Sequence, residues 1–187
     1  MGQRLTCAFV LLLGLWAFYP RGLTVEETDS GLSSLQGTVF YQGIPFTGTV
    51  VCRFPNGSLA RSLGYAQGLR DGLSKAWYGD GRLESLRLFR QGLRQGTHES
   101  WWPDGRRRFR HRFRDDVPQG LSEDWYPSGQ LYQAMHYQGG HESGLQTIYH
   151  SDGRIESNYE VIDGQRFGLV NSRGCHGGTL ARAASRQ

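Results

Sequence analysis

Six arginines crowd into nine residues near the middle of the chain, between positions 106 and 114. Four of them, Arg108, Arg110, Arg112 and Arg114, alternate with other residues, and alternate side chains of a β-strand project from the same face. Guanidinium groups recognise carboxylates and phosphates through paired hydrogen bonds. We therefore predict a row of arginines that is solvated, partly neutralised by neighbours such as Glu84 and Asp124, or matched to an anionic partner.

Two aromatic residues, Trp102 and Tyr132, complete the predicted partner-binding set. Most other aromatic residues recur in fixed columns, and we expect these to pack against their equivalents in neighbouring repeats. Trp102 and Tyr132 are expected on the opposite face, where their rings would be free to contact another molecule.

Catalytic chemistry is not predicted. The sequence has no nucleophile elbow, no phosphate-binding loop and no Cys-x-x-Cys pair. The dipeptide Cys175-His176 lacks the further ligands that zinc or copper requires. We therefore expect a non-enzymatic protein with no cofactor, no metal and no small-molecule substrate.

The formal net charge is +4, but it is distributed unevenly. Without Arg4 and Arg21 the chain has 19 basic and 17 acidic residues, so the arginine row stands out in a nearly neutral background. Such a row suits an acidic protein or anionic lipid headgroups. We expect a protein partner, with anionic lipid as the alternative, and no nucleic acid.

Glycine sets the organisation of the chain, because it recurs every 24 residues in two registers. The first register is 48, 72, 96, 120, 144 and 168, and the second is 57, 81, 105, 129 and 153. A tandem array of this kind presents a long surface rather than one closed pocket. This organisation favours binding over catalysis.

Within each unit, apolar and polar residues alternate with the period of a strand. The segments FPNG at 54–57, WPDG at 102–105 and YPSG at 126–129 predict tight turns, because proline presets φ and glycine accepts positive φ. The second joint, as in QGLRQG at 91–96, is expected to be a longer loop. The predicted fold is all-β: an open, twisted antiparallel β-meander built from tandem 24-residue two-stranded repeats.

The pattern G-x-x-x-x-[WY]-[WYF]-x-x-G, followed by an apolar strand and Tyr-x-x-G, resembles the MORN-like repeats of bacterial YwqK-family antitoxins. The resemblance covers about residues 36 to 170. It implies an interaction module that binds protein or lipid, and for the antitoxin type it implies neutralisation of a toxin by direct binding.

The N-terminus resembles a secretory signal, since MGQR is followed by a mostly apolar segment at 5–19 that is short for a membrane span. We expect a signal peptide or anchor at 1–24, a polar linker at 25–35, the repeat domain at 36–176 and a disordered tail at 177–187. Cys52 and Cys175 are expected to be free or intermolecular. The sequence thus predicts an exported, extracytoplasmic scaffold for protein–protein interaction. The alternatives are a cytoplasmic antitoxin and a module that binds anionic membranes.

Overall fold

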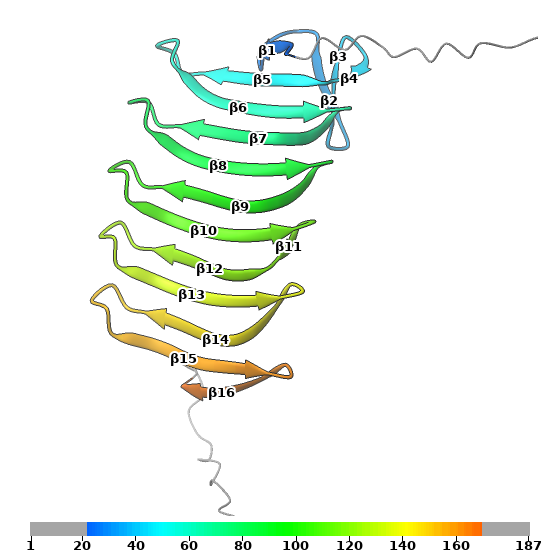
Figure 1. Ribbon diagram of the computed structural model, residues 1–187. Helices are drawn as coiled ribbons and strands as arrows, with labels where there is room; N and C mark the ends of the chain where they lie inside the picture. Colours follow the sequence, from blue (N-terminus) through cyan, green and yellow to red (C-terminus); the bar gives the residue numbers. More distant parts are fainter. Residues whose placement is uncertain (1–21, 170–187) are drawn as a thin grey trace, which may run out of the picture.

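The computed structural model describes residues 22–169, which fold into a 13-stranded open sheet and a small three-stranded sheet (Figure 1). The small sheet contains β2 (Leu32–Leu35), β3 (Thr38–Tyr41) and β4 (Ile44–Pro45). The large sheet contains β1 (Thr24–Glu26), β5 (Gly48–Arg53), β6 (Leu59–Ala66), β7 (Leu69–Trp77), β8 (Leu83–Arg90), β9 (Leu93–Trp101), β10 (Arg107–Arg114), β11 (Val117–Pro118), β12 (Gly120–Trp125), β13 (Leu131–Gln138), β14 (His141–Tyr149), β15 (Ile155–Ile162) and β16 (Gln165–Leu169). This part of the chain contains no helix able to span a membrane. Residues 1–21, which make up most of the signal segment predicted at 1–24, lie outside the described residues, as do residues 170–187 with Cys175 and the predicted tail.

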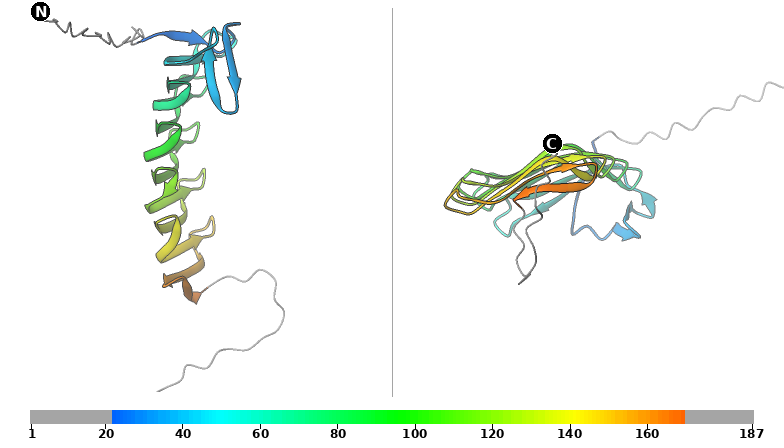
Figure 2. Two further views of the ribbon diagram at one scale, coloured as in Figure 1. Left: turned by 90° about the vertical axis from the view of Figure 1, so that its right-hand side faces the viewer. Right: turned by 90° about the horizontal axis from the view of Figure 1, so that it is seen from below.

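The large sheet is a single layer in which successive strands lie side by side along the whole array (Figures 1 and 2). From β5 to β16 the pairing is antiparallel, which confirms the predicted open meander. The first strand differs, because β1 runs parallel to β5 with Val25 opposite Val50. The sheet is therefore mixed at its N-terminal edge.

The small sheet stands against one face of the large sheet at its N-terminal end (Figure 2). The hydrophobic core forms there, where Val25, Phe46 and Val50 are almost fully buried and Leu32 and Val39 pack against them. Residues 25–35, predicted to be a linker, instead form β1 and β2. Burial of Val25 and Leu32 on this face gives the segment a fixed place.

One joint of each repeat is a tight turn that ends in glycine, and three of these turns are the predicted proline-containing segments at 54–57, 102–105 and 126–129. In the first repeat the Phe54 N–H donates to the Ser58 carbonyl, and the Gly57 N–H donates to the Phe54 carbonyl. Asn56 Oδ1 accepts from the Ser58 N–H, and an aspartate or serine repeats this contact in the later turns. These side chains fix the turns by the Asx mechanism.

The other joint is shorter than predicted. It is a two-residue hairpin turn in which both residues have positive φ, as in Gln67-Gly68 at 51° and 79° and Gln91-Gly92 at 49° and 84°. This conformation matches the right-handed twist of the flanking strands. The glycine-flanked loop expected over 91–96 is therefore wrong, since Leu93 already belongs to β9.

The remaining glycine of each repeat lies in a β-bulge. Between the pairs Leu88–Gln95 and Leu86–Glu99, β9 contains two more residues than β8, and Gly96 adopts φ 64° there. The same irregularity recurs between β6 and β7 and between β13 and β14. Bulges bend a strand and increase its twist, so their repetition curves the sheet.

Cross-strand pairs divide the sheet into two faces. We call the face that carries His98, His111 and Met135 the inner face, because its central residues are buried. The small sheet packs against this face. We call the face that carries Arg110 and Arg112 the outer face, since these residues alternate with His111 along β10.

Candidate functional site

The arginine row lies on β10 as predicted, and three of its members share the outer face. Arg110 pairs across the strands with Glu99 and Glu123, Arg112 with Thr97, and Arg114 with Val117. Arg112 and Arg114 are exposed and make no ion pair within residues 22–169. They are the part of the row that is open to an anionic partner.

Arg110 is already neutralised. Its Nη2 lies 2.7 Å from Glu123 Oε2, and both side chains are partly buried. The neighbouring Glu99 forms an ion pair with Arg107, with Oε1 3.2 Å from Nη2. The expected neutralisation by Asp124 does not occur on this face, because Asp124 projects from the inner face.

Arg108 is separated from the row by a bulge between Arg107 and Phe109. Its guanidinium lies 4.7 Å from the centre of the Trp102 ring. In the next repeat Tyr132 and Tyr126 occupy the equivalent positions, and their rings meet edge to face at 5.1 Å. Trp102 and Tyr132, both predicted as free contact residues, therefore belong to two copies of one packing arrangement.

Trp102 also links two repeats. Its indole Nε1 donates to the Trp125 carbonyl at 3.2 Å. Tyr78 and Tyr126, which precede and follow it in the same column, donate through their hydroxyls to Trp101 and Tyr149. Trp102 is half-buried in this role, whereas Tyr132 keeps 38% of its surface exposed.

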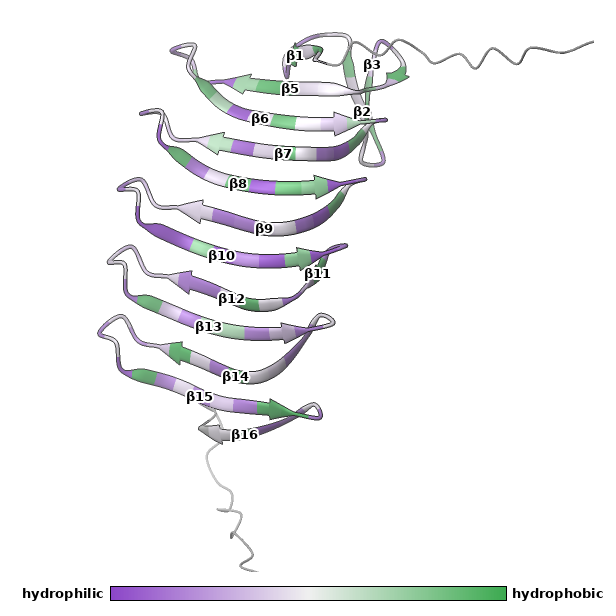
Figure 3. Ribbon diagram, viewed as in Figure 1, coloured by the Kyte–Doolittle hydropathy of each residue, from purple (hydrophilic) through white to green (hydrophobic). Residues whose placement is uncertain are grey.

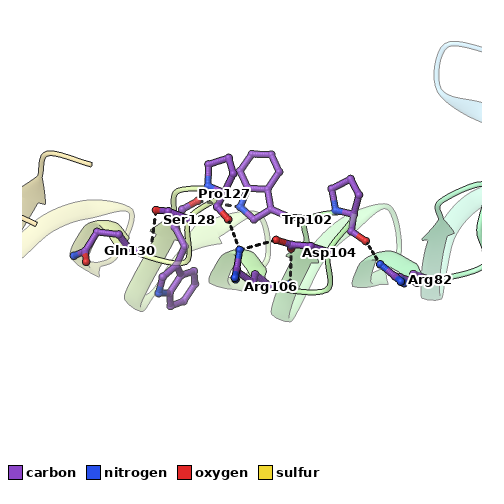
Figure 4. Close-up of polar contacts among 9 residues, drawn as sticks. Arg82, Trp102, Asp104, Arg106, Pro127, Ser128 and Gln130 are labelled. Atoms are coloured by element: carbon purple, nitrogen blue, oxygen red, sulfur yellow. Dashed lines mark hydrogen bonds and ion pairs between the residues drawn. The ribbon is translucent and has the colours of Figure 1, made fainter. Parts of the chain in front are cut away.

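The tight turns are linked to one another along the side of the sheet where the strands end (Figure 4). Arg82 Nη1 donates to the Pro103 carbonyl at 2.6 Å, and Arg106 Nη1 donates to the Pro127 carbonyl at 3.3 Å. Arg106 also pairs with Asp104 of its own turn at 2.9 Å. Arg106 is thus part of the turn structure and does not extend the exposed row.

Exposed apolar residues also lie on the outer face, on β7, β8, β9 and β11. Leu73 and Leu88 face each other across β7 and β8, with 50% and 38% of their surfaces exposed. In Figure 3, β8 ends in a hydrophobic segment whereas β10 is largely hydrophilic. We call the combined surface the basic–apolar surface, and it consists of Leu73, Leu88, Leu93, Arg112, Arg114 and Val117.

A polar network that the sequence did not predict lies on the inner face. His111 Nε2 lies 3.1 Å from both carboxylate oxygens of Asp124, and Gln133 Nε2 donates to Asp124 Oδ2 at 2.7 Å. Burial alone would raise the pKa of Asp124, but the hydrogen bonds from His111 and Gln133 outweigh it and lower the pKa below its ordinary value. The network fixes neighbouring strands and offers no open ligand position.

His98 occupies the bulge on the same face. Its ring is 3% exposed and lies between Phe89 and Phe113, with centroid distances of 5.3 and 5.0 Å. Nε2 lies 2.8 Å from the Leu88 carbonyl. Burial lowers the pKa of His98, so the ring is held neutral. Within residues 22–169 no group of three potential metal ligands is present.

A family model described as MORN repeat variant matches residues 118–138. The matched segment extends from the end of β11 through β12 to the end of β13. It supports a MORN-like repeat protein, since the other repeats have the same strands, turns and bulges. Repeats of this family typically form non-enzymatic scaffolds that bind protein or membranes. No curated protein matches the chain.

Proposed function

We propose that this protein is an exported, non-enzymatic scaffold that binds another protein through the basic–apolar surface. The observation that carries the proposal is that two arginines without an ion pair lie with exposed leucines on a sheet face that no other segment of residues 22–169 covers. Apolar side chains supply binding energy when they are desolvated, and charged neighbours select the partner and its orientation. A partner with an apolar strip beside acidic residues would match this surface.

The test begins with capture of the partner by cross-linking and mass spectrometry, followed by measurement of its affinity for purified variants. The double substitution Arg112→Gln, Arg114→Gln should weaken binding by about tenfold and flatten its salt dependence, because two screened ion contacts are lost. The double substitution Arg53→Gln, Arg154→Gln is the control, since it removes the same charge from arginines with carboxylate partners of their own. Equal affinities for the two double variants would refute the proposed surface.

The same surface supports binding to anionic membranes as a second candidate, because basic residues beside exposed leucines also suit a lipid interface. Sedimentation with vesicles of phosphatidylserine and phosphatidylcholine distinguishes the two. Membrane binding requires retention on the anionic vesicles and its loss in the Arg112, Arg114 double variant. Protein binding persists without any vesicle.

Export is the part of the proposal that rests on the apolar segment at residues 5–19. Fractionation of the producing cell should place the protein outside the cytoplasm. A soluble cytoplasmic protein that retains Met1 would instead favour the antitoxin alternative, for which the captured partner should be a toxin whose activity is inhibited on binding.

A further inference from the structure

Comparison of equivalent positions in successive repeats reveals two arginines that lack a carboxylate partner. Arg94 shows the complete arrangement. Its Nε donates to Asp116 Oδ1 at 2.8 Å, its Nη2 donates to the Asp116 carbonyl at 3.0 Å, and the guanidinium lies over Phe113 at 4.1 Å. The carboxylate and the ring together fix this cation.

Arg70 is the equivalent of Arg94 one repeat earlier, and its carboxylate is missing. The backbone link is the same, because the Gly92 N–H donates to the Arg70 carbonyl at 2.7 Å, as the Asp116 N–H does to Arg94. Gly92 has no side chain, however. The Arg70 guanidinium lies between the rings of Tyr65 and Phe89, and Nη1 approaches Ser74 Oγ at 3.4 Å.

Arg87 differs in the same way from its equivalent, His111. The partner of His111 is Asp124, and the residue one repeat before Asp124 is Ser100. Ser100 is buried and donates its hydroxyl to the Glu84 carbonyl. Arg87 is exposed, and like Arg70 it makes no ion pair with any residue from 22 to 169.

Both arginines line one hollow on the inner face, with a volume of about 270 Å³. The hollow also includes Arg61, Lys75, Glu84 and the hydroxyl-bearing residues Ser74 and Ser85. Arg61 is neutralised by Glu27, to which its Nη2 donates at 2.8 and 3.0 Å. Lys75 lies opposite Leu86 and so projects from the outer face. Arg70 and Arg87 counted against Glu84 therefore leave the hollow with a net charge of about +1.

We propose that this hollow is a binding site for a carboxylate-bearing ligand, with Arg70 and Arg87 as the groups that bind it. In the following repeat the equivalent residues each contact a carboxylate, Arg94 that of Asp116 and His111 that of Asp124, whereas Arg70 and Arg87 have no carboxylate partner within residues 22–169. Serine hydroxyls beside the guanidiniums provide further donors to a carboxylate oxygen. The volume accepts a small dicarboxylate or the end of an acidic side chain, and the site is separate from the basic–apolar surface on the outer face.

The first experiment measures binding of succinate to the purified protein by calorimetry at constant ionic strength. Arg87→Gln should weaken succinate binding by about tenfold or more, because a hydrogen bond to a charged group is lost. Arg154→Gln is the control, since it removes an exposed arginine that already has a carboxylate partner, Asp152, and that does not line the hollow. The proposal is overturned if the wild-type protein binds neither succinate nor a peptide that contains glutamates.

A second variant tests the comparison between repeats directly. Gly92→Asp places a carboxylate beside Arg70, as Asp116 lies beside Arg94. The turn tolerates aspartate, because Asp116 adopts φ 66° at the equivalent position, and a Cβ at Gly92 would come no closer than 3.9 Å to Leu69. The variant retains every arginine and should still lose succinate binding by about tenfold. A folded Gly92→Asp protein that binds succinate like the wild type would refute the role of Arg70.

A comparison of ligands identifies the source of the carboxylate. A peptide containing glutamates is compared with succinate and with inorganic phosphate. Preference for the peptide, with loss in Arg87→Gln, assigns the hollow to an acidic segment of a protein, whereas preference for succinate assigns it to a small metabolite. Equal binding of phosphate would show that the site selects charge alone, which overturns carboxylate recognition.

Discussion

Replacement of His98 by alanine should destabilise the centre of the sheet more than any change in exposed charge. The substitution leaves the Leu88 carbonyl without its donor, which costs about 1–3 kcal/mol for a buried group. It also removes ring contacts with Phe89 and Phe113, which are worth about 0.5–1.5 kcal/mol each. We expect a loss of roughly 3 kcal/mol in the free energy of unfolding. Urea denaturation at pH 7.5, followed by tryptophan fluorescence, measures it.

His98→Gln is the matched control, because the chain uses glutamine two repeats later. Gln146 is fully buried, donates to the His136 carbonyl at 2.9 Å and accepts from the His136 N–H at 2.9 Å. His98→Gln should therefore satisfy Leu88 and lose only the ring contacts, at about 1–2 kcal/mol. If His98→Gln and His98→Ala were equally destabilised, the carbonyl would not be the main cost and the reasoning would fail.

The His98 variants also test how this histidine affects the pH dependence of stability. The folded pKa of His98 lies below its unfolded value, so its contribution to stability is complete above about pH 6.5. As the pH falls, the unfolded chain takes up a proton that the buried ring resists, and stability is lost through the folded pKa. His98→Gln should reduce this loss between pH 7.5 and 5. An unchanged pH dependence would contradict a buried neutral histidine.

Three further predictions concern the links between repeats. Tyr126→Phe should cost about 1 kcal/mol in urea denaturation, because the hydroxyl donates to Tyr149, whereas Tyr132→Phe should cost less than half of that. Gly68→Ala should cost about 3 kcal/mol or more, since a Cβ there meets Thr38 and the Val39 carbonyl at positive φ. Gly57→Ala, which meets nothing within 4 Å, should cost only about 1–2 kcal/mol, and equal losses would argue against the clash. Asp124→Asn should reduce the acid-induced loss of stability below about pH 4, because the lowered pKa of Asp124 stabilises the folded state above that pH.

The repeat pattern predicted the strands and one of the two joints because these depend on local chemistry. Proline, a short polar residue and glycine specify a turn wherever they occur in this order, and alternation specifies a strand face. The two-residue turns were missed because Gln67 and Gln91 adopt positive φ, which glutamine rarely does without support. That support comes from the preceding repeat, where Thr47 and Asp71 accept the N–H groups of Gln67 and Gln91.

The alternation of side chains along a strand was the only basis for predicting the candidate site. Parity predicted Arg108, Arg110, Arg112 and Arg114 on one face, which holds for the last three. It could not show that Glu123 neutralises Arg110 or that a bulge directs Arg108 to Trp102. Both outcomes depend on which residues of neighbouring strands lie opposite each other. The strands within residues 25–35 were missed for a related reason. β1 forms by parallel pairing with β5, and the three strands of the small sheet lie between these two strands in the sequence.

The proposed carboxylate site has its physical origin in an irregularity of the repeat. Backbone geometry is nearly constant along the array, so equivalent side chains one repeat apart occupy equivalent places about 10 Å apart, or two strands. Where a column keeps its partners, as with Arg94 and Asp116, the side chains satisfy one another and stabilise the sheet. Where only one partner is replaced, as with Arg70 and Gly92, the scaffold still holds the cation in position but leaves it without an anion. The proposed carboxylate recognition therefore depends on the two incomplete columns of Arg70 and Arg87, because the curved sheet supplies the same frame to every repeat.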